Sequence, residues 1–306
     1  MLDLQLAAGA TEIYVGLVSE PLKVLTFNAH ARMRDEHPTQ VNSPALLGDI
    51  ITDAHAKGVT VHFSANIAYL PAALHAAYVT HVQTAVALGV DTVLVANLGL
   101  MRLLREAGLT IPLVAAGYMG VTTTAFARYL QTALGVVRVV LPHAMTLDEI
   151  AAFAAIPGLE IEVQVQTGAG NSCGRCMMAD SPVKPEIGLG CRAGYTVRAP
   201  DGTTTHGLPF LDGATDCALC NVTDLMAIGV HAIKIPGRES PNVRTNAKIT
   251  QMYRKAIHDA VAGKPLDVTI QEIDQVELMW QMNWVPRFCE NLRCRFRDTP
   301  TTQSYI

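Results

Sequence analysis

Short apolar runs alternate with longer segments of helical spacing through the first two thirds of the chain. Apolar runs without polar interruption are typical of parallel strands that are covered on both faces. We predict seven such strands, at Glu12–Gly16, Val59–Ser64, Thr92–Ala96, Pro112–Ala115, Val136–Leu141, Ile161–Val165 and Ala232–Ile235. The accompanying helices are predicted at Leu2–Ala8, Ser43–Lys57, Ala72–Ala87, Leu98–Glu106, Thr123–Leu134 and Thr146–Ala155. This alternation predicts an α/β fold built from repeated βα units.

The repeated units favour a TIM-like (β/α) barrel. A closed barrel of this kind has eight strands, so we expect that one strand is either unrecognised or precedes residue 1. An open, doubly wound sheet is the alternative, and it usually carries a glycine-rich phosphate loop after a strand. No GxGxxG sequence follows a predicted strand, and Gly168-Ala-Gly170 is too short to count.

Residues 167–222 interrupt the alternation with a segment rich in Gly, Pro, Asp, Thr and Cys. Within it, Tyr195–Arg198 and Thr203–His206 flank Asp201-Gly202, a strong signal for a hairpin turn. A long irregular insert in a compact domain is usually functional or disordered. We therefore expect this Cys-rich insert to leave the barrel at the face where sites are built.

Length and composition fit one large domain with a small addition. The chain has 306 residues, of which 50% are hydrophobic and 16% charged, and it can bury a sizeable core. We predict a barrel over residues 1–265, which includes the insert, and a C-terminal extension over residues 266–306 packed on the barrel. The extension carries Cys289 and Cys294. Three interpretations of these cysteines are open: a pair within one loop, ligands of a second metal, or two unrelated thiols.

The charge balance and the N-terminal sequence limit the classes of protein. A net charge of −4 and a pI near 6.2 provide no global basic field for nucleic acid, which leaves only a local basic groove open. The first residues lack the basic and apolar segments of a signal peptide. No stretch reaches the roughly 20 uninterrupted apolar residues of a membrane helix. We expect a cytoplasmic protein without a membrane span.

Five of the seven cysteines lie between residues 173 and 220. Two CxxC pairs, Cys173–Cys176 and Cys217–Cys220, flank Cys191, and each pair places two sulfur atoms on one tight turn. Four thiolates hold a tetrahedral zinc ion or an iron–sulfur cluster. We predict that Cys173, Cys176, Cys191 and Cys220 bind a metal, with Cys217 as the alternative fourth ligand. Buried structural thiols are the competing interpretation.

Several polar residues follow predicted strands, where a barrel binds its substrate. Lys234 and Arg238 flank Pro236-Gly237 after the last strand, and cations at this rim commonly bind carboxylate or phosphate. Arg192 adjoins a proposed metal ligand, and Asn66 ends a strand with an amide suited to orienting a substrate. We predict substrate binding by Asn66, Arg192, Lys234 and Arg238. A rim ion pair and a turn cap are the structural alternatives.

The sequence contains no recognisable motif of a hydrolase active site. There is no HExxH, GxSxG or phosphate-binding P-loop sequence. His62 lies within a strand and His143 follows one, and neither has an evident partner. A zinc ion held by four thiolates has no open position for a catalytic water.

Four segments of the chain resemble the U32 family, historically called U32 peptidases. They are Ala8–Gly16, Phe27–Ala29 with Arg32, Ser172–Cys176 with Gly190–Arg192 and Tyr195, and Asn221–Leu225 with Gly229–Arg238. The resemblance implies a TIM-like barrel and a 4Fe-4S cluster held by four cysteines. It also implies oxygen-independent hydroxylation of RNA bases or ubiquinone precursors, while some members are described as collagen-degrading proteases.

The chain departs from the family pattern at three places. Gln166-Thr-Gly168 lacks the cysteine that the family has at its first ligand position, and Cys173 stands where the family usually has serine. Pro236 replaces an acidic residue near the last motif. The ligand set is therefore not inherited intact, and a substitute ligand must come from the other cysteines.

Together these features predict an iron–sulfur-dependent U32-type enzyme. We expect a 4Fe-4S cluster, with zinc as the alternative, and an oxygen-independent hydroxylase or related redox enzyme that acts on a small aromatic or nucleobase-containing substrate. The alternatives are a U32-type peptidase with a structural metal site and a non-catalytic accessory subunit. In the last case the partner is a second U32-type subunit.

Overall fold

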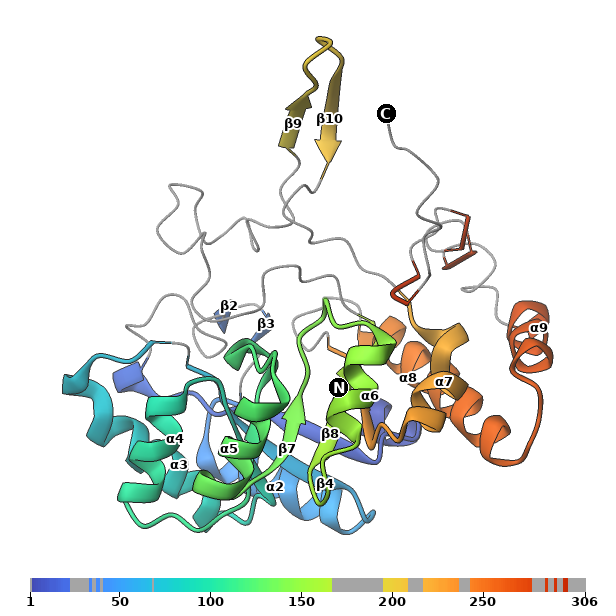
Figure 1. The fold of residues 1–306 in the computed structure, drawn as a ribbon. Helices are drawn as coiled ribbons and strands as arrows, with labels where there is room; N and C mark the ends of the chain where they lie inside the picture. The colour runs from blue at the N-terminus through green and yellow to red at the C-terminus, as the bar shows by residue number, and fades with distance from the viewer. Residues whose placement is uncertain are drawn as a thin grey trace.

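The computed structural model describes residues 2–22, 33–34, 37–38, 41–67, 69–166, 195–208, 217–236, 243–276, 284–285, 289–290 and 294–296. Its centre is one sheet of seven parallel strands that curls into a half-barrel (Figure 1). The strands are β1 (Glu12–Val15), β4 (Thr60–Ala65), β5 (Thr92–Val95), β6 (Leu113–Ala115), β7 (Val136–Val140), β8 (Glu160–Gln164) and β11 (Ala232–Lys234). All seven predicted strands are present, with ends within two residues of the prediction.

Strand order confirms the TIM-like fold and excludes the doubly wound alternative. Each strand after β1 pairs with the strand of this sheet that comes before it in the chain, so the order β1-β4-β5-β6-β7-β8-β11 contains no reversal. A doubly wound sheet requires a point at which the order reverses. Among the described residues, no strand pairs with both β1 and β11, and these two strands are the edges of the sheet.

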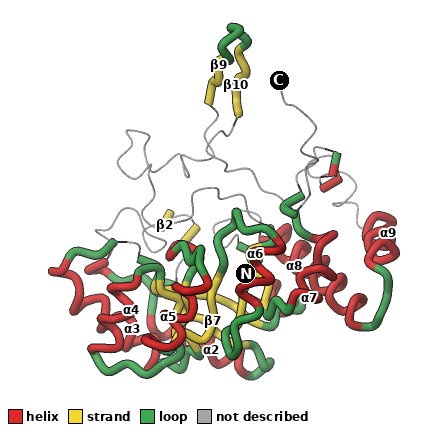
Figure 2. The backbone as a smooth tube through the Cα atoms, in the orientation of Figure 1, coloured by secondary structure: helices red, strands yellow, loops and turns green. Residues whose placement is uncertain are grey.

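Helices cover the convex face of the sheet (Figure 2). They are α2 (Pro44–His55), α3 (His75–Ala87), α4 (Leu98–Glu106), α5 (Thr124–Leu134), α6 (Leu147–Ala154), α7 (Val222–Ile228) and α8 (Val243–Val261). Side-chain caps explain several of the helix starts. Ser43, Asn97 and Thr123 each accept a hydrogen bond from a backbone N–H three residues later, and Thr146 forms a capping box with Glu149.

Side chains alternate between the two faces of each strand. Outward side chains such as Val61, Phe63 and Val93 are fully buried beneath the helices. A second, small apolar cluster lies inside the barrel and consists of Leu94, Ala96, Val114, Ala116 and Val140. The barrel interior is therefore partly apolar, and its remaining positions are polar.

The helical layer continues across the open seam between β1 and β11. There α1 (Leu2–Ala7) packs against α8, and Thr250 donates a hydrogen bond to Gln5 with 2.8 Å between the oxygen atoms. Inside the seam, the Lys234 ammonium lies 4.2 Å from the centre of the Tyr14 ring. Side chains thus connect the two edge strands where no backbone pairing is described.

The predicted hairpin is present as β9 (Tyr195–Arg198) and β10 (Thr204–Leu208), which pair antiparallel and project away from the barrel (Figure 1). Asp201 accepts a hydrogen bond from the Thr203 N–H at 2.8 Å, and Gly202 adopts a left-handed φ of 86°, as this turn requires. A short ladder, β2 (Met33–Arg34) with β3 (His37–Pro38), lies in the first long loop.

Residues after Lys264 add α9 (Leu266–Val276) and three short described pieces. The last piece returns to the barrel, where the Arg295 N–H donates to the Cys217 carbonyl at 2.9 Å and the Arg295 side chain to the His143 carbonyl at 3.2 Å. The predicted boundary at residue 265 stays a prediction. No helix among the described residues combines the length and apolar character needed to cross a membrane.

Candidate functional site

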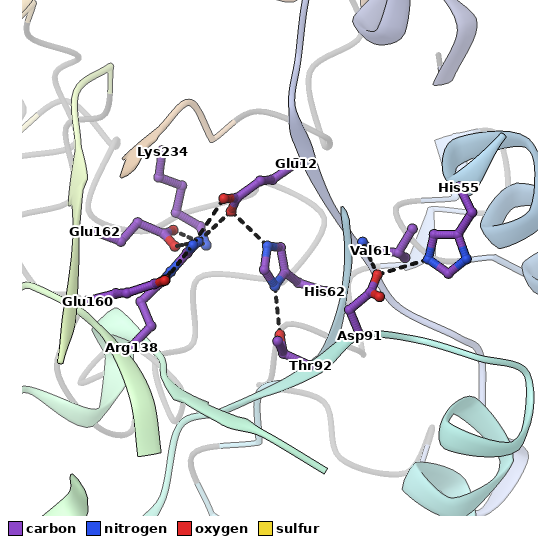
Figure 3. Close-up of polar contacts among 10 residues, drawn as sticks. All are labelled: Glu12, His55, Val61, His62, Asp91, Thr92, Arg138, Glu160, Glu162 and Lys234. Atoms are coloured by element: carbon purple, nitrogen blue, oxygen red, sulfur yellow. Dashed lines mark hydrogen bonds and ion pairs between the residues drawn. The ribbon is translucent and has the colours of Figure 1, made fainter. Parts of the chain in front are cut away.

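The N-terminal half of the barrel interior holds a network of charged side chains (Figure 3). Arg138 on β7 donates to Glu160 at 2.7 Å, to Glu162 at 3.2 Å and to Glu12 across the barrel at 3.0 Å. The Lys234 ammonium donates to the other oxygen of Glu162 at 3.0 Å. Two cations thus face three carboxylates from four strands, and each of the five groups has an opposite charge beside it.

Pairing controls the ionisation of this network. Burial alone would raise the pKa of the Glu12 carboxyl, but hydrogen bonds from His62 and Arg138 outweigh it and lower the pKa to about 2. Burial opposes ionisation of Glu162 as well, yet the charges of Lys234 and Arg138 hold its pKa below the usual value. The same carboxylates raise the pKa of the Arg138 guanidinium against the opposing effect of its burial. Glu12, Glu162 and Arg138 are therefore each held in the charged form.

His62 has two partners in this network, although its sequence position suggested none. Its Nε2 lies 2.8 Å from Glu12 Oε2, and its Nδ1 lies 2.6 Å from the Thr92 hydroxyl. Hydroxyl, imidazole and carboxylate in a row resemble a nucleophile–base–acid chain. However, the carboxylate of Glu12 is also held by Arg138, and Thr92 and Glu12 are the first residues of their strands. This end of a TIM-like barrel generally serves stability rather than catalysis.

A cavity of about 330 Å³ adjoins this network at the N-terminal end of the strands. Its lining includes Glu12, His62, Thr92, Arg138 and Glu160. Glu12, His62, Thr92, Arg138 and Glu160 already bind one another, and none of them has a buried side-chain nitrogen or oxygen without a partner among the described residues. We interpret the charged network at the N-terminal end of the strands as a structural feature rather than a ligand-binding site.

The C-terminal half of the interior has a different character. Ser64 lies two residues beyond the inward-facing His62 on β4 and shares its inward face, and Asn66 directly follows the last residue of that strand. Ser64 is fully buried, and neither its Oγ nor the Asn66 Oδ1 has a hydrogen-bond partner in the part of the chain that is described. Asn66 was predicted as a substrate-binding residue from its place after a strand, and the structure puts it at the inner rim of the barrel.

Gln164 contributes a third polar group on this side. It follows the inward-facing Glu160 and Glu162 at the same two-residue spacing, and its amide crosses β7 to reach Gly117 beyond β6. A Cβ atom added to Gly117 would lie 2.8 Å from Gln164 Nε2. Sequence analysis did not single out Ser64 or Gln164. The signal was the recurrence of polar residues at every second position of an otherwise apolar strand.

Lys234 was predicted to bind substrate at the rim, and its side chain turns inward instead to Glu162 and the Tyr14 ring. Its role in substrate binding stays a prediction, but the ammonium already has a carboxylate partner. Arg192 and Arg238, the other two predicted cations, lie outside the described residues.

The proposed metal ligands are only partly described. Cys173, Cys176 and Cys191 lie outside the described residues, and Cys217 and Cys220 lie within them. The first three belong to the part of the chain between Gln166 and Cys217. Both ends lie beside the C-terminal end of β8, where the Ala218 N–H donates to the Val165 carbonyl at 3.2 Å.

The two cysteines of the second CxxC pair differ in their surroundings. Cys217 is buried, its sulfur lies 3.8 Å from the Tyr253 hydroxyl, and burial raises the pKa of its thiol to about 12. Cys220 is exposed, and the pKa of its thiol is raised by burial of the sulfur and by the neighbouring Cys294. Cys217 and Cys294 are also paired through a parallel backbone bridge. Cys217, Cys220 and Cys294 therefore lie near one another, and Cys220 is the more exposed member of its CxxC pair.

Comparisons with known proteins agree with the fold and the motifs. Dihydrodipicolinate synthase DapA-2 of Bacillus anthracis superimposes with a TM-score of 0.50 at 10% identity, covering 90% of this chain and 71% of that protein. tRNA hydroxylation protein P of Escherichia coli is 26% identical over 72% of this chain and 60% of its own length. The protein of that name from Haemophilus influenzae is 25% identical over 87% of this chain and 67% of its own length.

The chain thus spans about three fifths to two thirds of these relatives. The family model that matches is described as peptidase family U32, and it covers residues 1–290, which is nearly the whole chain. This match includes the barrel, the Cys-rich insert and α9, in the order in which the sequence motifs occur. The chain belongs to peptidase family U32.

Proposed function

We propose that this protein takes part in the oxygen-independent hydroxylation of a base in tRNA. The observation that carries the proposal is the similarity of most of the chain to two proteins named for tRNA hydroxylation. The uncharged polar groups at the C-terminal side of the barrel, Ser64, Asn66 and Gln164, support it, because a base is read by hydrogen bonds to its edges.

We further propose that Cys173, Cys176, Cys191 and Cys220 hold a 4Fe-4S cluster. Support for Cys220 over Cys217 comes from the described thiols, because Cys220 is exposed at the C-terminal face while Cys217 is enclosed beside Tyr253. A ligand must be deprotonated and able to reach the cluster. When bound, such a cluster supplies electron transfer at a potential set by its surroundings.

The remaining residues of the site hold and orient the substrate. Asn66 is proposed to contact the base, and Arg192 and Arg238 are proposed to bind phosphate groups of the RNA, for which guanidinium geometry is suited. Lys234 is assigned a positioning role, because its ammonium already binds Glu162 and lies on the Tyr14 ring.

The proposed reaction is tested on tRNA from cells that lack their own U32 hydroxylation proteins. Expression of this chain should produce a tRNA nucleoside heavier by one oxygen atom, measured by mass spectrometry of digested tRNA. Cys220→Ala should abolish the product, and Cys289→Ala, which changes a thiol outside the proposed set, should retain it. Unchanged nucleoside masses in cells that contain the folded, metal-loaded protein would refute the proposal.

The metal is tested separately on protein purified without oxygen. We expect a brown protein whose iron and acid-labile sulfide match a 4Fe-4S cluster, and we expect the cluster to protect Cys220 from alkylation. A colourless protein with one zinc ion per chain would establish the alternative metal. Co-purification of a second U32-type chain in equal amount would show that the accessory-subunit alternative also has to be considered.

A further inference from the structure

We propose that Ser64, Asn66 and Gln164 form the polar half of a binding site for an uncharged planar ring at the C-terminal side of the barrel interior. The inference rests on the proposed function and deepens it, because it assigns residues to substrate recognition. The three residues come from β4, the loop after it and β8.

Strand alternation places Ser64 and Gln164 on the inner face, and Asn66 directly follows β4. His62 and Glu162 contact Glu12 and Lys234 inside the barrel, so their strands present even-numbered side chains inward. Ser64 and Gln164 are the next inward residues toward the C-terminal ends of those strands. The interior therefore changes along its axis from a self-paired charged network to uncharged polar groups.

Two of these groups have unmet hydrogen bonds. The Ser64 Oγ and the Asn66 Oδ1 are shielded from solvent and have no partner within the described part of the chain. A buried polar atom without a partner costs about 1–3 kcal/mol, and native proteins keep few of them. Asn66 is half-buried at the rim, and Ser64 lies deeper along the same strand face. A ligand that enters past Asn66 would complete both hydrogen bonds.

Gly117 permits the position of the third group. With no side chain there, the Gln164 amide lies close over the backbone after β6, above Val140. Any larger residue would push the amide aside, because a Cβ atom would lie 2.8 Å from Gln164 Nε2. Gly117 adopts no positive φ, so its backbone conformation does not itself require glycine. The close approach of the amide is a sufficient reason for glycine at this position.

The surroundings select an uncharged, flat ligand. The apolar residues Leu94, Ala96, Val114, Ala116 and Val140 lie on β5, β6 and β7 or directly after them, between β4 and β8 in the sheet. Lys234, which is the register partner of Gln164 on the neighbouring strand, is already paired with Glu162. Two exposed tyrosines, Tyr69 and Tyr118, follow β4 and β6 on the same rim, with 61% and 43% of their surface exposed. Exposed aromatic rings at a rim stack on flat rings such as nucleobases.

The test measures binding of the four RNA nucleosides and of benzoate by saturation-transfer NMR. Wild type should bind at least one nucleoside and should bind benzoate more weakly, because the three proposed residues offer uncharged hydrogen-bonding groups. Ser64→Ala, Asn66→Leu and Gln164→Met should each weaken the binding about tenfold, the effect of losing one hydrogen bond. Gly117→Ala should weaken it as much as Gln164→Met, and Thr132→Ala, which removes an exposed hydroxyl on α5, should have no effect.

Thermal unfolding supplies a second readout that needs no ligand. Ser64→Ala removes a polar atom without a partner, so its Tm should equal or exceed that of the wild type. A lower Tm, undiminished nucleoside binding in the variants, or equal binding of benzoate would overturn the inference. If the protein binds nucleosides as described but adds no oxygen to tRNA, the proposed reaction is wrong and the proposed binding site is still supported.

Discussion

Arg138 shows how one residue determines the state of its neighbours. Its guanidinium is 8% exposed and contacts three carboxylates, on β1 and β8. A buried ion pair contributes little net stability compared with apolar packing, but removal of one partner leaves the other charges uncompensated. A substitution of Arg138 therefore lowers stability mainly because its carboxylate partners lose their opposite charge.

Replacing Arg138 by methionine should lower the free energy of unfolding by about 3–5 kcal/mol, because Glu12 and Glu162 then remain buried without this cation. Urea unfolding monitored by circular dichroism measures the change. Arg102→Met, which removes an exposed pair with Glu106, is the matched control and should change stability little. The double variant Arg138→Met/Glu12→Gln should lose less than the sum of the single changes. Additive losses would contradict the assignment of this contact.

The alternation of residues along the strands indicates which residues of the site face inward, but not which of them contact one another. Asn66 is found from its place after a strand. The contact of Arg138 with Glu12 joins residues 126 positions apart, and that of Lys234 with Glu162 joins residues 72 apart. Curvature of the sheet creates both contacts, and no local pattern encodes curvature. For this reason Lys234 was expected at the rim as a substrate anchor.

At the scale of elements, strands were predicted more completely than helices. A continuous apolar run bounded by glycine or proline is a local signal, and each of the seven predicted strands is found. Helix α8 was not among the predicted helices, although Ile249, Met252, Tyr253 and Ala256 recur at the spacing of one buried helix face. Polar residues occupy most of the other positions of α8, so this narrow apolar stripe was not recognised in the sequence.

Helix α8 also holds the turn that carries the second CxxC pair. The hydroxyl of Tyr253 donates to the Val165 carbonyl at 2.8 Å and accepts from the Ala218 N–H at 3.0 Å. One buried side chain thus joins α8, the end of β8 and the residue after Cys217. The position of Cys220 depends on this contact.

Tyr253→Phe should therefore reduce stability by about 1–3 kcal/mol, because buried backbone groups lose a partner. It should also speed the alkylation of Cys217, whose sulfur lies beside the lost hydroxyl. Chemical unfolding and mass spectrometry of alkylated peptides measure the two effects. Tyr129→Phe, at an exposed position on α5, is the control and should leave both unchanged. If Cys217 stays unreactive in a destabilised variant, the hydroxyl does not protect this thiol.

For the whole molecule, a buried histidine and a half-buried carboxylate in different layers contribute to the response of stability to acid. His81 on α3 lies under the helical layer with its ring centre 5.1 Å from that of Phe63, and burial lowers its pKa to about 4. Glu12 lies inside the barrel, and its pKa is lowered to about 2. Both groups bind a proton more readily in the unfolded chain, so acid favours unfolding in each case.

Stability should vary little between about pH 6.5, the ordinary pKa of histidine, and about pH 8.5, the ordinary pKa of cysteine. It should fall as the pH drops toward 4, because unfolded His81 takes up a proton that the folded state resists. Over this range the loss attributable to His81 is about 3 kcal/mol. Below about pH 4.3 a second decline should follow as Glu12 is protonated in the unfolded chain, continuing to about pH 2. Urea unfolding at a series of pH values measures both.

His81→Leu should remove the first decline and keep the second, and His258→Gln, at an exposed histidine, should keep both. A first decline that persists in His81→Leu would assign the proton uptake to another group.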